Sequence, residues 1–312
     1  MNKPPFGQSA TWALRYAPHV GYLPPFHPLF RHIAGGSGLE GQIDFIARQG
    51  FAGVLHPWVA AQPPEARRAF AALLKDHGLD AGCIVYTGLE QIMRPLWVSG
   101  TGQDRRDLLA QIDMAADAAA EVGSRVIAVL IVENPDDSHD AQVAKLRDNL
   151  RFAADVASTR EVVLGIEPML ALPGMLFQTA GAAADVLREV AHPAAWLIFD
   201  TAHIARMEGD ILAAQTRLAD LVCLYQLADT PDRTEPGSGT IDFVALLTRL
   251  MQEGYTGLVE LEHGWSAEGA DVERDGLAAL RDIEIGGRRQ PCYGISQCTG
   301  LTEPQCQSIL GD

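Results

Sequence analysis

The sequence has little positive charge and no long apolar run. Its 312 residues include 24 lysines and arginines against 40 acidic residues, a formal net charge of −16. A nucleic-acid partner calls for a basic face, so this balance argues against one. No apolar run reaches the roughly 20 residues of a membrane-spanning helix, and residues 1–8 lack the pattern of a secretory signal. We therefore expect a cytoplasmic protein with a small-molecule substrate and no membrane partner, and we leave association into a homo-oligomer open.

Cysteine is also scarce, at 5 residues. Cys83 and Cys223 lie in predicted strands, where a buried thiol packs as a small apolar side chain. Cys292, Cys298 and Cys306 have spacings that match no zinc-binding pattern. These three belong to 285–312, a stretch without periodicity and rich in turn formers, for which we expect an irregular tail. The predicted single domain is therefore 1–284.

The sequence does contain a regular alternation of strand-like and helix-like segments. With 47% hydrophobic residues the chain can bury a large core, and its length suits one α/β barrel, which typically takes about 250 residues. Eight predicted strands alternate with helices, the count of a (β/α)8 TIM barrel. The predicted strands are 12–17, 52–58, 81–86, 125–132, 162–166, 197–199, 221–227 and 258–261.

A doubly wound open sheet is the alternative fold. Gly36, Gly38 and Gly41 fit a G-x-G-x-x-G pattern at the start of a predicted helix. The residues before this pattern contain prolines and basic side chains and make a poor buried strand, and no acid follows the second strand to take a ribose hydroxyl. The pattern therefore indicates a turn and a helix start, and the barrel is the better prediction.

Polar side chains stand at the ends of four predicted strands: Glu167, Asp200, Gln226 and Glu262. The carboxyl ends of barrel strands meet at one rim, where ligands bind. A single carboxylate at a strand end is more often a helix cap or an ion-pair partner. Three carboxylates and an amide oxygen together match the oxygen ligands of a hard or borderline divalent cation. The four positions jointly predict a metal site.

Motifs around these positions resemble the hydroxypyruvate isomerase family within the xylose isomerase-like TIM barrels. That superfamily also holds ketose 3-epimerases, inosose dehydratases and endonuclease IV-type DNA repair enzymes. The resemblance covers the C-terminal half in order and spacing, whereas the N-terminal half fits only in its strand–helix alternation. The matching stretches are Gly-Ile-Glu-Pro-Met at 165–169 with Pro173-Gly174, Phe199-Asp-Thr-Ala-His203 through Asp210, the block 226–239, and Gly254-Tyr-Thr-Gly257 with Glu262.

The resemblance implies a divalent metal, Mg²⁺ or Mn²⁺, held by Glu167, Asp200, Gln226 and Glu262. It also implies that Glu167 and Glu262 carry a proton between neighbouring substrate carbons, through an enediolate, in an aldose–ketose type isomerisation of a small hydroxy-keto acid. His203 and Arg233 resemble the family's substrate-binding histidine and arginine.

Departures from the family pattern bear on the substrate. Leu170 and Leu224 replace an Asn and a His, and Thr240 replaces a Glu, which predicts a substrate larger or more apolar than hydroxypyruvate. Pro173 stands where ketose 3-epimerases have a second substrate-binding Glu, and Gln226 replaces their His, so both favour the hydroxypyruvate isomerase branch.

Several alternatives stay open. His203 alone is as well explained by a structural hydrogen bond, and Arg233 by an ion pair with Glu235 or Asp229. Glu260, two residues before Glu262, is expected to lie one layer deeper in a structural role. The rival functions are a sugar or keto-acid epimerase, a non-catalytic barrel that binds a metal or sugar acid, and phosphodiester cleavage, which the charge and the lack of a His-rich ligand set disfavour.

Overall fold

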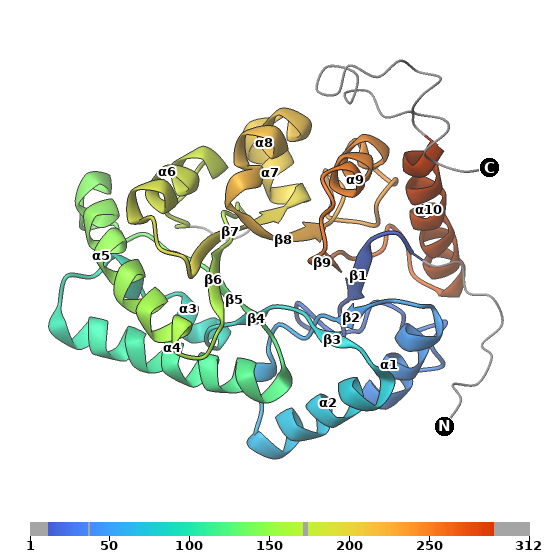
Figure 1. Ribbon diagram of the computed structural model, residues 1–312, viewed down its shortest axis with the longest axis horizontal. Coiled ribbons are helices and arrows are strands. Elements are labelled where there is room, and N and C mark those ends of the chain that lie inside the picture. The colour runs from blue at the N-terminus through green and yellow to red at the C-terminus, as the bar shows by residue number, and fades with distance from the viewer. Residues whose placement is uncertain (1–11, 37, 171–173, 290–312) are drawn as a thin grey trace.

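The chain forms a closed barrel of parallel strands surrounded by helices (Figure 1). The computed structural model describes residues 12–36, 38–170 and 174–289. Seven strands pair in parallel in the order β1-β9-β8-β7-β6-β5-β4, and β2 pairs in parallel with β3. The strands are β1 (Arg15–Pro18), β2 (Gly53–Val54), β3 (Asp80–Ala81), β4 (Ile84–Val85), β5 (Val126–Val129), β6 (Val163–Ile166), β7 (Ala195–Asp200), β8 (Val222–Leu227) and β9 (Leu258–Leu261).

Backbone hydrogen bonds join the two sheets into one ring. On one side of β2, the Leu55 amide donates to the Pro18 carbonyl at 2.9 Å; on the other, the Gly82 amide donates to the Val54 carbonyl at 2.8 Å. β3 and β4 are two halves of the third predicted strand, interrupted at Gly82 and Cys83. Counted as one position, they complete eight, so the predicted (β/α)8 barrel is confirmed.

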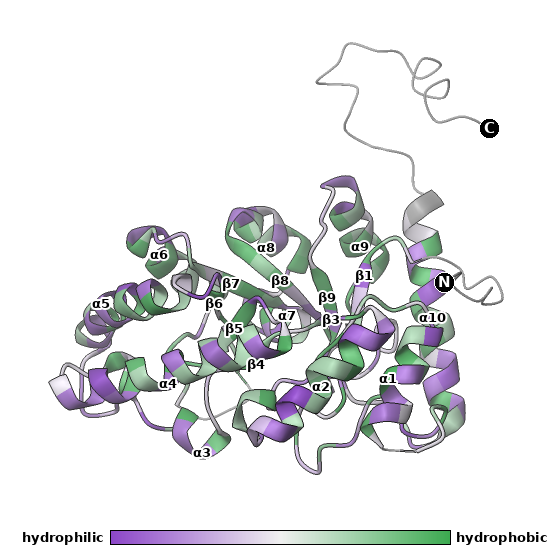
Figure 2. Ribbon diagram, turned by 60° about the horizontal axis from the view of Figure 1, so that its bottom comes forward, coloured by the Kyte–Doolittle hydropathy of each residue, from purple (hydrophilic) through white to green (hydrophobic). Residues whose placement is uncertain are grey.

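Helices cover the outside of the ring because each buries one apolar side against the strands. The chain carries good helix starts: Thr101, Ser138, Thr179 and Asp242 each accept a backbone amide at a helix N-terminus. Figure 2 shows polar and apolar residues on different sides of these helices. No helix among the described residues is long and apolar enough to cross a membrane. The helices are α1 (Leu39–Arg48), α2 (Pro64–His77), α3 (Leu89–Ile92), α4 (Gly102–Val122), α5 (His139–Ser158), α6 (Ala180–Val190), α7 (Thr201–Glu208), α8 (Ile211–Leu218), α9 (Phe243–Gln252) and α10 (Ala270–Arg289), with short 3₁₀ turns η1 (Val59–Ala61), η2 (Leu96–Val98) and η3 (Ala219–Leu221).

The last helix, α10, holds the beginning of the chain in place. Two of its glutamates are buried: Glu284 accepts the amides of Ala13 and Leu14, and Glu273 accepts the amides of residues 32 and 33. These contacts fix β1 and the loop that follows it. The predicted boundary at residue 285 falls inside α10, and 290–312, the rest of the predicted tail, lies outside the described residues.

Candidate active site at the carboxyl ends of the strands

The four predicted metal ligands lie on neighbouring strands at one rim. Glu167 follows β6, Asp200 ends β7, Gln226 is in β8 and Glu262 follows β9. Asp200 pairs in register with Gln226 across β7 and β8. The Glu262 amide donates to the Leu227 carbonyl at 3.2 Å, which extends the β8–β9 pairing to that residue. The side chains therefore come from three successive pairs of adjacent strands.

A one-residue irregularity in β8 decides which way Gln226 faces. Leu197 pairs with Val222, but the next residue, Ile198, pairs with Leu224, so Cys223 is an extra residue on β8. Side chains alternate between the two faces of a strand, and a shift of one residue reverses them. If the register of Leu197 with Val222 continued without this irregularity, Asp200 would lie beside Tyr225 instead of Gln226. The glycine at position 165 leaves the space that the Cys223 and Ile198 side chains occupy. A Cβ at this position would lie 3.3 Å from the Cys223 sulfur and 2.6 Å from Ile198.

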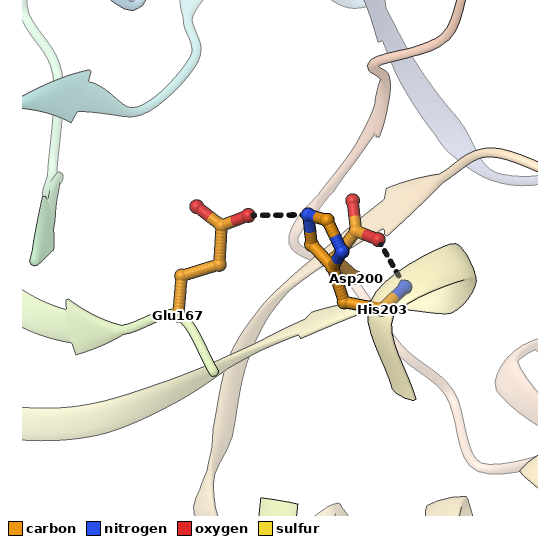
Figure 3. A group of neighbouring side chains, drawn as sticks. All are labelled: Glu167, Asp200 and His203. Atoms are coloured by element: carbon orange, nitrogen blue, oxygen red, sulfur yellow. Dashed lines mark hydrogen bonds and ion pairs between the residues drawn. The ribbon is translucent and has the colours of Figure 1, made fainter. Parts of the chain in front are cut away.

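Glu167, Asp200 and His203 converge from β6, β7 and the first turn of α7 (Figure 3). One potential ligand atom from each of the three lies within 4.8 Å of the other two. Asp200 caps α7 by accepting the His203 amide at 2.9 Å, and His203 Nε2 lies 3.7 Å from Glu167 Oε1. All three side chains are buried. The spacing of three residues between Asp200 and His203 thus has a local cause, the N-cap of a helix.

Arg233 joins this cluster from the loop after β8. Its guanidinium donates to Asp200 in bidentate fashion, at 2.9 and 2.8 Å, and to Glu262 Oε2 at 3.1 Å. It also lies 3.3 Å from His203 Nε2. Arg233 has a φ of +57°, in the left-handed region that side chains rarely adopt. Its ion-pair partners are therefore two of the predicted metal ligands, and neither Glu235 nor Asp229.

Asp229 builds the loop that presents Arg233. Its Oδ1 accepts the amides of Thr230 and Ile241, and its Oδ2 accepts those of Gly237 and Gly239, all between 2.8 and 3.0 Å. The side chain is fully buried. A carboxylate with four backbone donors fixes the whole turn from 229 to 241, and this explains why the matching block from 226 to 239 is rich in small residues.

Burial and mutual repulsion change the pKa values of these carboxylates. Burial, with repulsion from Asp200, raises the pKa of Glu167 to about 8. Burial raises the pKa of Glu262 well above its usual value, although Arg233 opposes the shift. Burial acts in the same direction on Asp200, but the Arg233 and His203 charges outweigh it and leave the pKa of Asp200 below its usual value. Burial lowers the pKa of His203 to about 4, so that imidazole is neutral at pH 7. Two acids with raised pKa values therefore lie beside one whose pKa is lowered.

Gln226 and Glu260 form a second layer below the rim. The Gln226 amide nitrogen donates to Glu260 Oε2 at 3.1 Å, while its carbonyl oxygen is buried without a hydrogen-bond partner among the described residues. Glu260 is fully buried and also accepts the backbone amide of Cys83 at 2.5 Å and its thiol at 3.2 Å. Burial raises the pKa of Glu260 to about 7. The partner that the sequence did not identify is thus Cys83, at the break between β3 and β4.

The residues present suit a divalent cation. Three carboxylates and an orphaned, buried carbonyl oxygen lie on adjacent strand ends, which is an oxygen-rich donor set of the kind that hard cations prefer. His203 Nε2 accepts from Arg233 and lies next to Glu167, so it offers a nitrogen donor that the sequence reasoning had given only to substrate. Arg233 meanwhile supplies positive charge to two of the acids.

Aromatic residues from the loop after β1 border the site and were not predicted as part of it. The Tyr22 ring lies 5.7 Å from the Arg233 guanidinium and 4.7 Å from the His19 ring. A cavity of about 500 Å³ opens beside them, between residues 19–32 and 263–268. Of the two leucines that replaced polar family residues, Leu224 lines a different cavity with Glu260, Cys83 and the starts of several strands. The departure at Leu224 therefore does not shape the rim where Arg233 lies.

Comparisons with known proteins agree with this geometry. Hydroxypyruvate isomerase of Escherichia coli K12 is 30% identical over 53% of this chain and 64% of its own length, so the chain matches just under two thirds of that protein. A 3-dehydro-D-guloside 4-epimerase of the same organism is 30% identical over 67% of this chain and 82% of its own length. The first match agrees with the predicted resemblance to the hydroxypyruvate isomerase family, and the two relatives are named an isomerase and an epimerase.

Solved structures share the fold. The crystal structure of the IOLI protein with a bound zinc atom superposes with a TM-score of 0.64 at 15% identity, covering 80% of this chain and 92% of that one. The sequence profile described as xylose isomerase-like TIM barrel matches residues 43–283, which include every predicted site residue. With its closed parallel barrel and its acids gathered at the carboxyl ends of the strands, this chain belongs to the xylose isomerase-like TIM barrel family.

Proposed function

We propose that the protein is a metal-dependent isomerase of a small hydroxy-keto acid, interconverting hydroxypyruvate and tartronate semialdehyde or a close relative. The observation that carries the proposal is the pair Glu167, which is buried, and Glu262, whose side chain is 12% exposed; both have a raised pKa and lie on either side of the Asp200–Arg233 ion pair. Glu167, Asp200, Gln226 and Glu262 would hold the cation, Mg²⁺ or Mn²⁺. When bound, such a cation supplies positive charge that stabilises an enediolate.

The chain's own residues supply the proton transfer. A carbon acid next to a carbonyl loses its proton to a carboxylate, and the neighbouring carbon receives one. A carboxyl group with a pKa near neutral pH suits both steps, because it is neither a weak base nor a weak acid there. Burial raises the pKa of Glu167 to about 8 in the absence of a cation, and a bound cation would lower the pKa from that value toward the acidic side. We assign the two transfers to Glu167 and Glu262.

Arg233 and His203 would hold the substrate. The Arg233 guanidinium is planar and already makes one bidentate contact with a carboxylate, which is the geometry it would use for a substrate carboxylate. The neutral His203 imidazole can accept from a substrate hydroxyl through Nε2. Recognition of an acid by Arg233 favours a hydroxy-keto acid over a neutral sugar.

An epimerase is the second candidate, and two observations favour it. One relative at 30% identity is named a 4-epimerase of a sugar derivative. The cavity of about 500 Å³ next to Tyr22 is also larger than a three-carbon acid requires. An epimerase would use the same two glutamates on one carbon instead of two. From the net charge of −16 we also propose that the protein has no nucleic-acid partner, and from its few cysteines, which fit no disulfide or zinc framework, a cytoplasmic location.

The test is a metal-dependent assay over a panel of small hydroxy-keto acids and ketoses, with the product identified and the reaction run in deuterated water. Isomerisation places deuterium on the original carbonyl carbon and moves the carbonyl to the neighbouring carbon; epimerisation keeps the carbonyl and places deuterium on the inverted carbon. Glu167→Gln and Glu262→Gln should each abolish turnover, whereas Glu268→Gln, on an exposed residue, should not. Metal binding without turnover of any compound would instead support a binding protein.

A further inference from the structure

The Gln226 side chain is held at one end only. Its amide nitrogen donates to Glu260 Oε2 at 3.1 Å and lies 3.7 Å from the Cys83 sulfur. The carbonyl oxygen at the other end of the same amide is buried without a partner among the described residues, and the residue is 1% exposed. A buried acceptor without a donor is costly unless something else occupies it. The free oxygen therefore points to a missing electropositive partner.

The register of the barrel places Gln226 between two acids. Across β7, β8 and β9, Asp200, Gln226 and Glu260 are register partners, so their side chains share the inner face of the barrel at one level. Glu260 accepts the hydrogen bond donated by the side-chain amide nitrogen of Gln226. The two branches of a planar amide diverge, and the oxygen is consequently directed away from Glu260, on the branch available to the rim that carries Asp200.

Glu260 is itself fixed as an acceptor. Its Oε1 accepts the Cys83 amide at 2.5 Å, and its Oε2 accepts both the Cys83 thiol and the Gln226 amide. The neighbouring Gly82 leaves the necessary room, because a Cβ there would lie 2.5 Å from Oε1 and 3.0 Å from the Leu55 Cα. A reversed Gln226 amide would place its carbonyl oxygen against a carboxylate oxygen. Only one amide orientation is compatible with this arrangement.

We propose that Glu260 is a positioning residue for the metal site, which holds the Gln226 amide so that its carbonyl oxygen, and not its NH₂ group, faces the cation. This inference rests on the proposed metal-binding role of Gln226 and adds a residue that touches neither metal nor substrate. Partners of this kind orient metal ligands in many proteins, and their loss lowers metal affinity by about 10- to 100-fold. An amide ligand needs the help more than a carboxylate does, because only one of its two ends can ligate.

The experiment measures Mn²⁺ affinity by calorimetry on the chelator-treated full-length protein and four variants. Glu260→Gln should weaken binding by about 10- to 100-fold, since a second amide can turn its NH₂ toward Gln226 and reverse it. Gln226→Leu should also weaken binding, and the double variant should bind no more weakly than Gln226→Leu alone. Cys83→Ala keeps the backbone donor to Glu260 and should stay close to the unchanged chain.

Comparing the two single variants with the double variant distinguishes an orienting role of Glu260 from a purely electrostatic one. If Glu260 acted through its negative charge, Glu260→Gln would weaken binding equally with or without Gln226, and the two losses would add; that result overturns the inference. An unchanged affinity of Glu260→Gln overturns it as well. In either case the proposed function survives if the unchanged chain binds Mn²⁺ and turns over substrate. If the unchanged chain binds no divalent cation, the proposed function fails first.

A swap variant covers the case in which Glu260→Gln fails to fold. Gln226→Glu with Glu260→Gln keeps the net charge and one amide–carboxylate hydrogen bond, but gives the rim a ligand that needs no orientation. This fifth variant should bind Mn²⁺ at least as tightly as the unsubstituted protein. Weaker binding by a folded swap variant, as judged by circular dichroism, would contradict the proposed role of the pair.

Discussion

Replacing Arg233 with methionine should destabilise the metal-free protein far more than the loss of an ordinary surface arginine. Arg233 is the positive partner of Asp200, which is fully buried, and of Glu262, whose side chain is 12% exposed. Methionine keeps an unbranched apolar side chain close to the length of the arginine stem and removes the charged guanidinium. The two acids then remain buried without a counter-ion, unless they take up protons or bind a cation.

The magnitude follows from the burial of the pair. Removing one partner of a buried ion pair costs about 3–5 kcal/mol, and the 19% exposure of the Arg233 side chain places the expected loss near the lower end, about 3 kcal/mol. For a domain of this size that corresponds to a fall in melting temperature of about 6 °C. The loss should be smaller at low pH than at high pH, because protonation of the Glu262 carboxyl, whose pKa is raised by burial, removes one of the two charges left without a counter-ion.

Thermal and urea unfolding of the chelator-treated protein measure this loss. The matched control is Arg48→Met, which breaks an ion pair with Asp44 whose side chains are 52% and 47% exposed; its expected cost is at most about 0.5 kcal/mol. Saturating Mn²⁺ should restore more stability to Arg233→Met than to the unchanged chain, because the cation no longer competes with a guanidinium for Asp200. Equal losses from Arg233→Met and Arg48→Met would refute the reasoning.

Three further predictions concern the acids and the glycine beneath the site. The pKa of Glu167 rises from about 4.5 to about 8 on folding, so the stability that this group contributes is present at low pH and is lost as pH rises toward 8. In the metal-free Glu167→Gln variant, the fall in the free energy of unfolding between pH 6.5 and 8 should therefore be less steep, by up to about 1.4 kcal/mol per pH unit. Asp229→Asn should cost about 2–4 kcal/mol in urea unfolding and raise KM, since an amide cannot accept from all four backbone donors that hold the Arg233 loop; an unchanged KM would contradict that link. Gly82→Ala should lower stability by about 1–3 kcal/mol through contact with Leu55 and Glu260, while Gly41→Ala, in a helix with open space around it, should raise stability by up to about 1 kcal/mol.

Most of the fold was predictable because its signals are local. Three strands lie within one residue of their predicted bounds: β6 at Val163–Ile166, β8 at Val222–Leu227 and β9 at Leu258–Leu261. Strand β3/β4 was predicted as one piece, because nothing in the local pattern announces that Glu260, distant in the sequence, needs the Cys83 amide. Helix α10 was not predicted. Its acids Glu273 and Glu284 are buried because they accept backbone amides near the start of the described chain, and no local pattern in the sequence indicates these contacts.

The candidate site, like the fold, has features that the sequence predicts and others that it does not. Placing Glu167, Asp200, Gln226 and Glu262 at strand ends needed only the strand pattern and a motif, and the structure puts all four at one rim. The partner of Arg233 was not predictable, because Glu235 and Asp229 are nearer in sequence but are occupied by Ser266 and by backbone amides respectively. Cys223 as an extra residue in β8 was equally hidden, since register depends on the neighbouring strand.

The contact of α10 with the start of the chain has a consequence for synthesis. Strand β1 closes the ring only by pairing with β9, and the amides at residues 13 and 14 meet their acceptor only when residue 284 exists. A ribosome-bound chain that ends before residue 258 has no β9 and therefore presents two unpaired strand edges, on β1 and β8, and such edges template association with other chains. Nascent or C-terminally truncated forms of this protein are consequently the ones that should need chaperones.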